Sequence, residues 1–201
     1  MDTVDSTHQS IVFTVPMNCD RRTEIVDLVY KWSEEALRGR RGNLVLCGAS
    51  SSYVNQPNDS VGASGRAFRN GSNNPFSSLG LCLTVGQLVR EYKAFWIKDG
   101  GVDLPRYPIP SETGTRLVKY DEYVRCLACR SLLSFIGFGH GESRGLYRDT
   151  IQQLLEPRAK AALPTLFTSI YSIEGLRGRL GNQIVSLMVK NGYEEVSLLE
   201  A

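Results

Sequence analysis

Residues 173–193 read IEGLRGRLGNQIVSLMVKNGY and carry the clearest periodic pattern in the chain. Apolar residues recur there at spacings of three and four, which is the period of an α-helix with one buried face. These residues are Ile173, Leu176, Leu180, Ile184, Leu187 and Met188. The pattern predicts one long amphipathic helix close to the C-terminus.

Small and polar residues alternate on the other side of this predicted helix. They are Gly175, Arg177, Gly178, Arg179, Gly181 and Asn182. Each glycine costs about 1 kcal/mol relative to alanine in a helix interior, so three together need a reason. One hypothesis is that a single RNA strand lies here, with its bases on the bare surface and its phosphates near the arginines. The alternative is a tight contact between helices beside two solvated arginines.

The composition is that of an ordinary globular protein, with 42% hydrophobic and 22% charged residues in a chain of 201. This length is enough for one well-buried domain. The net charge of +2 is only mildly basic, and no dense block of Lys and Arg occurs. Proteins that coat nucleic acid through a disordered basic arm carry such a block. Any RNA contact must therefore come from a few placed arginines.

The cysteines indicate free thiols in a reducing compartment, because their number is odd and no secretory signal is visible. They are Cys19, Cys47, Cys82, Cys126 and Cys129. Residues 1–10 are polar and are expected to form a flexible terminus rather than a signal peptide. No window approaches the roughly 20 apolar residues of a membrane span, so no membrane partner is predicted.

Three further amphipathic helices are predicted, at residues 20–38, 84–98 and 120–136. Between the first two, residues 43–80 are rich in Gly, Ser, Asn and Pro and are interpreted as a long loop insertion. Only the NLVLC run at 43–47 within it resembles a strand.

The remaining segments are short. Prolines exclude a helix at 102–115 and favour extended structure or edge strands. Two short helices are expected at 146–155 and 158–170. Four long amphipathic helices with one small extended element predict an all-α fold, a four-helix bundle, that forms a single domain over residues 1–201.

Signals for an enzyme are weak. The glycine-rich stretch 137–145 could wrap phosphates, but it is expected to follow a helix, whereas the nucleotide-binding fingerprint follows a strand. Only His8 and His140 are present, so no two-histidine metal site is predicted within the fold. Cys126 and Cys129 are interpreted as ordinary buried thiols rather than zinc ligands. We predict a protein without enzymatic activity, cofactor, metal or small-molecule substrate.

The order of the helices and four local patterns resemble the coat proteins of rigid rod-shaped plant viruses, of the tobacco mosaic virus type. The patterns are QSIVF at 9–13, QLVREYKAFWIK at 87–98, LVKYDEYVRCLACRSLLSFIGF at 117–138 and LRGRLGNQIVSLMVKNGYEEVSLLE at 176–200. The resemblance implies a subunit that assembles head-to-tail into a helical filament around single-stranded genomic RNA. It also implies a location in the virion and in the host cytoplasm.

The resemblance also implies roles for individual residues. Arg177 matches an RNA-facing arginine of the last helix, Asn182 an asparagine near the bases, and Gly178 a small residue there. Arg144 and Arg148 fall near arginines that meet phosphate. Arg179 has no counterpart in the family but lies on the same face of the predicted helix, as do Gly175 and Gly181.

The chain departs from this family in two respects. Residues 43–80 have no counterpart, because the family has a short turn there. The paired carboxylates that drive disassembly of such rods are not matched, so that mechanism is not implied. Two other functions stay open: a small soluble RNA-binding regulator such as a silencing suppressor, and an all-α protein-interaction adaptor.

Overall fold

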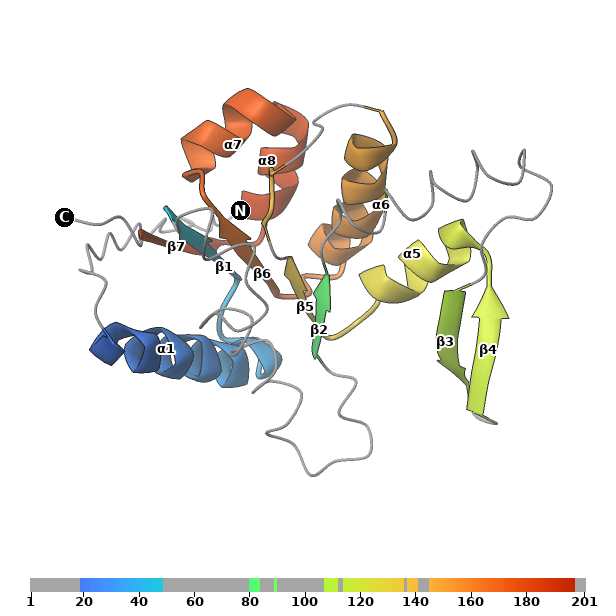
Figure 1. Ribbon diagram of the computed structural model, residues 1–201, viewed down its shortest axis with the longest axis horizontal. Coiled ribbons are helices and arrows are strands. Elements are labelled where there is room, and N and C mark those ends of the chain that lie inside the picture. The colour runs from blue at the N-terminus through green and yellow to red at the C-terminus, as the bar shows by residue number, and fades with distance from the viewer. Residues whose placement is uncertain are drawn as a thin grey trace, which may run out of the picture.

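A computed structural model describes residues 19–48, 80–83, 89, 107–111, 114–135, 137–140 and 145–197. In these residues the chain forms a five-stranded parallel sheet with helices on both faces (Figure 1). The strands are β1 (Asn43–Cys47), β2 (Gly80–Leu83), β5 (Leu132–Phe135), β6 (Thr165–Ser169) and β7 (Tyr193–Ser197). Their order across the sheet is β2-β5-β6-β1-β7.

The central strands are buried on both faces, as parallel strands covered by helices usually are. Every residue of β1 and of β6 is buried. The register pairs Leu44 with Leu166 on β6 and with Glu194 on β7. Successive side chains point to opposite faces, so β1 contributes to two separate apolar layers.

The helices are divided unequally between the two faces of the sheet. One helix, α1 (Cys19–Leu37), covers one face, and α6 (Leu146–Lys160), α7 (Ile173–Leu180) and α8 (Asn182–Val189) lie on the other (Figure 1). On the α1 side, Val29 and Trp32 pack against Leu44 and its neighbours.

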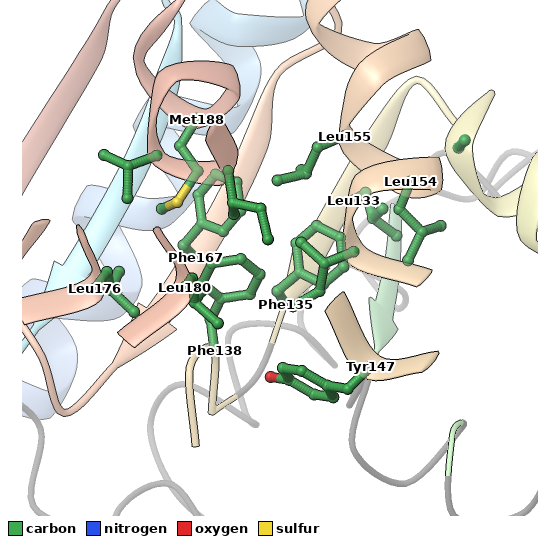
Figure 2. Packing of buried hydrophobic residues seen from close by; sticks show 14 of the residues in the cluster. Leu133, Phe135, Phe138, Tyr147, Leu154, Leu155, Phe167, Leu176, Leu180 and Met188 are labelled. Carbon is green, nitrogen blue, oxygen red and sulfur yellow. The ribbon is translucent and has the colours of Figure 1, made fainter. Parts of the chain in front are cut away.

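The larger apolar cluster lies between the sheet and the second group of helices. At its centre the ring of Phe167 stacks on Phe135 at a centroid distance of 5.4 Å and meets Phe138 edge-on at 4.9 Å. Figure 2 shows these rings enclosed by leucines of the sheet and helices, with Tyr147 beside them. These side chains join β5 and β6 to the helices above them.

A small antiparallel hairpin lies beside α5 (Tyr120–Ala128), apart from the main sheet (Figure 1). It consists of β3 (Tyr107–Ser111) and β4 (Gly114–Val118). The two prolines of β3 are compatible with its position as an edge strand, because proline cannot donate a ladder hydrogen bond.

The prediction of an all-α four-helix bundle is wrong, because three of the predicted helical or tail segments are strands. The helix predicted at 120–136 ends at Ala128, and its last residues form β5. The helix predicted at 158–170 is instead the end of α6 followed by β6. The C-terminal tail forms β7. Short apolar runs in buried strands cannot be told from helical segments by periodicity alone.

The long C-terminal helix is also two helices rather than one. It breaks at Gly181, whose backbone has φ +87°, a conformation that L-residues rarely adopt. The predicted periodicity survives the break, since Leu176, Leu180, Ile184 and Met188 are all buried.

Several other expectations are confirmed. The helix predicted at 20–38 is α1, the NLVLC run is a strand, and extended structure occurs at 107–111. Val89 is helical, as predicted, but the rest of 84–98, like residues 1–10 and most of 43–80, lies outside the described residues. None of the described helices combines the length and apolar character needed to cross a bilayer.

Candidate functional site

The order of the strands reverses at β1, and this places a candidate site at the carboxyl ends of the central strands. Strands β2, β5 and β6 lie on one side of β1, whereas β7, the last strand, lies on the other. In open parallel sheets, ligands bind outside the carboxyl ends of the strands at such a reversal. The described residues that follow these strands, Gly48 after β1, 137–140 after β5 and 170–172 after β6, therefore form the candidate site, which we term the carboxyl edge.

The turn after β5 packs tightly beneath α7. Gly139 has φ +78°, and a Cβ atom at this position would lie 2.4 Å from Cδ2 of Leu176. Any other residue there would be strained by the positive φ and would require the side chain of Leu176 to move. The turn is tied to β6 as well, because Phe138 donates its backbone N–H to the carbonyl of Thr168 at 2.7 Å.

The segment after β6 leads directly into α7. Ser169 donates its hydroxyl to the carbonyl of Phe138 at 2.8 Å and accepts the N–H of Tyr171 at 3.0 Å. Ser172 then caps α7, since its hydroxyl accepts the N–H of Gly175 at 3.2 Å. Both loops of the carboxyl edge are thus fixed by short side chains.

Arg179 connects α7 to both loops. Its Nε donates to the carbonyl of Gly139 at 3.0 Å, and its guanidinium lies 4.7 Å from the ring centroid of Tyr171. Tyr147 contacts the same residue: burial is the larger effect and raises the pKa of Tyr147, whereas a backbone hydrogen bond from Gly139 favours the ionised phenol. Two side chains from different helices therefore contact the backbone of the same residue, Gly139.

Glu195 makes a second connection, at the other end of α7. One of its carboxylate oxygens accepts the backbone N–H of Ile173 at 3.0 Å and the thiol of Cys47 at 3.3 Å. Burial, and secondly the charge of Glu195, raises the pKa of the Cys47 thiol to about 12. The thiol is therefore a neutral donor at physiological pH and a poor nucleophile.

These two connections form one structural unit, which we call the carboxyl-edge clasp. Its members are Cys47, Gly139, Tyr147, Tyr171, Ile173, Arg179 and Glu195. The clasp holds both ends of α7 on the sheet through groups that come from five other segments of the chain.

The residues predicted to bind RNA are only partly gathered at this edge. Arg177 is occupied at the surface, where it contacts Glu174 and the side-chain oxygen of Asn182 at 3.3 and 3.2 Å. Arg148 packs against Gly181, and Arg179 belongs to the clasp. Arg144 lies outside the described residues. A binding role for this set stays a prediction.

The three glycines of the last predicted helix have separate structural reasons. A Cβ at Gly175 would lie 3.1 Å from Cβ of Tyr171, and Gly181 provides the break between α7 and α8. Gly178 faces open space. The row is therefore not one continuous bare surface for stacked bases.

The prediction against a mononucleotide site rested on a wrong premise. The glycine-rich stretch 137–145 follows strand β5 and precedes helix α6, and not a helix as expected. Within the described part of the chain, no group of three or more His, Cys, Asp or Glu residues could hold a metal ion.

No protein-family model and no curated protein sequence matches this chain. Solved structures do match. The DnaC helicase loader gives a TM-score of 0.55 over 90% of this chain and 92% of its own, at 14% identity. DnaI gives 0.56 over 90% and 87%, at 16% identity. AMPPCP-bound DnaA from Aquifex aeolicus gives 0.53 over 91% of this chain and 48% of its own, at 10% identity.

These likenesses show the fold, an α/β fold like that of AAA+ domains, and they correct the resemblance to viral coat proteins. The neighbours are replication proteins, so a capsid function, single-stranded RNA in a helical filament and a location in the virion are all wrong. The resemblance rested on amphipathic helix patterns, which many unrelated folds share because they reflect burial alone. The all-α adaptor is excluded with the all-α fold.

Sequence reasoning named Arg179 but missed the other members of the clasp. Cys47 and Glu195 lie on β1 and β7, and their contact depends on the pairing of these two strands. One signal was available: the strand-like run NLVLC is followed directly by Gly48, which indicates that the strand ends at Cys47.

Proposed function

We propose that this protein acts in DNA replication as a binding adaptor of the helicase-loader type, without enzymatic activity of its own. The observation that carries the proposal is the reciprocal match to the DnaC loader, which extends over 90% of this chain and 92% of that one. The match to DnaA covers only 48% of the DnaA chain. A loader is therefore the better guide to function than an initiator.

The fold alone does not establish this role, because one fold can host many functions. The described surface adds support, because it offers positions for protein contacts. Tyr30 and Leu37 on α1 and Leu117 on the hairpin are large apolar side chains that are 43–57% exposed.

The test is complex formation between the full-length protein and the replicative helicase of the same organism. The two purified proteins are mixed, and the mass of the product is measured by size-exclusion chromatography with light scattering. We expect a discrete complex, and faster unwinding of a forked DNA by the helicase when the adaptor is added. A helicase of unrelated sequence serves as the control.

A mixture that elutes as two separate proteins, with unchanged unwinding, would contradict the helicase-loader proposal. A Leu117→Ser variant then refines a positive result. If the hairpin contributes to the interface, this variant weakens the complex, whereas the Tyr30→Ser variant on α1 leaves it intact.

A further inference from the structure

One of the matching structures, DnaA, is bound to AMPPCP, which raises the question of whether this chain also binds a nucleotide. Binding of a nucleoside triphosphate in a parallel α/β sheet has recognisable requirements. A glycine-rich loop after the first strand ends in Gly-Lys-Ser/Thr, so that the lysine contacts the phosphates and the hydroxyl contacts Mg²⁺. An acidic residue on a neighbouring strand holds the same ion.

This chain does not meet the first requirement. None of its six lysines, at 31, 93, 98, 119, 160 and 190, follows a glycine. After β1 the sequence reads GASSSYVNQPNDSVGASGR, and Arg66 is the first cationic residue in it. The phosphates of a bound nucleotide would therefore lack the lysine that this type of loop supplies.

The second requirement also fails. Strand β5 ends at Phe135 and continues as IGFGHGE, so the first carboxylate after it is Glu142, seven residues further on. Strand β6 ends at Ser169 and continues as IYSIE. No acidic side chain follows either strand directly, where a metal ligand would have to be.

The structure shows what the carboxyl edge contains in place of these groups. The backbone N–H of Ile173, at the start of α7, is satisfied by the protein's own Glu195. The carbonyl of Gly139 is satisfied by Arg179, which bridges the two loops. An anionic and a cationic side chain of the chain itself thus occupy polar groups at the two ends of α7.

We propose that the carboxyl-edge clasp makes this domain independent of nucleotide: it holds α7 on the sheet permanently, and neither ATP nor ADP binds or moves it. The inference concerns the chain alone and does not depend on the identity of its partner. Under the proposed function it means that the protein binds its partner equally well with and without nucleotide.

The hydrogen bonds of the clasp are sufficient to hold α7 on the sheet. Removal of one partner leaves a partly buried donor or acceptor unsatisfied, which costs more than the hydrogen bond itself contributes. Glu195 has two donors to satisfy, Ile173 N–H and the Cys47 thiol. Loss of its carboxylate should therefore loosen the first turn of α7 and leave α6 unaffected.

The first experiment titrates the wild-type protein with MgATP and MgADP. Binding is measured by isothermal titration calorimetry up to several millimolar, above the usual range of KM values, about 1 μM to 1 mM. Hydrogen–deuterium exchange of α7 is followed in the same samples. We expect no saturable heat and unchanged exchange. Saturable binding, or a nucleotide-dependent change in α7, would overturn the inference.

The second experiment measures exchange in variants without nucleotide. Glu195→Ala should raise the exchange rate of the α7 amides by at least about fivefold, because Ile173 and Cys47 lose their acceptor. Glu195→Gln retains an acceptor oxygen and should restore most of the protection. Glu174→Ala, which removes an exposed salt bridge on the same helix, is the matched control and should have little effect.

The outcomes separate this inference from the proposed function. If Glu195→Ala leaves α7 exchange unchanged, the clasp is refuted. If that variant fails to fold, Glu195→Gln and the wild-type nucleotide titration still decide. Absence of both nucleotide binding and a helicase complex would refute the loader role and support the clasp. Nucleotide binding together with a helicase complex would refute the clasp and support the loader role.

Discussion

The amino edge and the carboxyl edge of the central sheet differ in the burial and the partners of their polar side chains. At the amino edge, where β5 and β6 begin, polar side chains are completely buried. Arg158 is 1% exposed, and Thr165 and Asn43 are 1% and 6% exposed. At the carboxyl edge, Glu195, Tyr171 and Arg179 are only partly buried or exposed and contact loops.

The amino edge is organised around the buried guanidinium of Arg158. It donates to the carbonyl oxygens of Ala128, Arg130 and Pro164 and to the hydroxyl of Thr165. No carboxylate faces it among the described residues, and burial lowers its pKa to about 10. Asn43 continues the network, because its side-chain oxygen accepts the N–H of Thr165 at 2.9 Å.

This difference indicates which edge contributes more to the stability of the fold. Buried polar networks that bond mainly to backbone groups fix strand ends in one arrangement. Loops at the carboxyl ends of parallel strands are the usual position of binding sites. We therefore expect substitutions at the amino edge to affect stability most, and those at the carboxyl edge to affect mainly the local motion of α7.

The largest expected effect is that of Arg158→Ala at the amino edge. Three buried acceptors and one partly buried acceptor would lose their donor, so the free energy of unfolding should fall by about 3–5 kcal/mol. Urea denaturation followed by circular dichroism measures it. Lys160→Ala, an exposed site in the same helical turn, should change stability by less than about 0.5 kcal/mol. A loss below about 1 kcal/mol for Arg158→Ala would show that the network is not structural.

An intermediate effect is expected from pH at the carboxyl edge. The ordinary pKa of 9.0 for the Cys47 thiol is raised to about 12 by burial and by Glu195. Between these values the folded protein retains a proton that the unfolded chain has lost. The thiol's contribution to stability is complete below pH 9 and falls by about 1.4 kcal/mol per pH unit toward pH 12.

The comparison of wild type with Cys47→Ala isolates this contribution, since other titrating groups cancel in the difference. The unfolding free energies of the two proteins are measured between pH 8 and pH 10.5. Their difference should be constant below pH 9 and should then change in favour of the variant. A difference that stays constant over the whole range would contradict the raised pKa.

The smallest expected effects come from the glycines at the carboxyl-edge helices, and their signs should be opposite. Gly178 faces open space within α7, so Gly178→Ala should stabilise the protein by about 0.5–1 kcal/mol. Gly181 has φ +87°, so Gly181→Ala should destabilise it by about 1 kcal/mol or more. Thermal unfolding distinguishes the two. Equal signs would mean that the break between α7 and α8 is not required.

The sequence predicted local structure well where one element had a partner on one face only. The pattern of α1 led directly to its bounds, and the prolines near Tyr107 led to extended structure. It failed at β5 because Leu132 and Phe135 continue the helical spacing of Val124 and Ala128, so that one period describes a helix and a strand. At β6 the apolar run TLFTS gave no alternation, since both faces are buried.

The candidate site was predictable only in part. Arg179 was singled out, but for a contact with RNA, whereas its partners are Gly139 and Tyr171. Glu195 and Cys47 showed no pattern that connects them, because they are 148 positions apart in the chain. Their contact follows from the parallel pairing of β1 and β7.

The sequence by itself determined which residues form the buried faces of the helices, that three glycines within 175–181 need a structural reason, and that no lysine follows a glycine. Only the tertiary structure decided that Arg158 is buried, that α7 is clasped at both ends, and that the strands form one parallel sheet. The physical reason is that periodicity and turn chemistry are local, whereas strand pairing and the partners of buried charges depend on residues far apart in the chain.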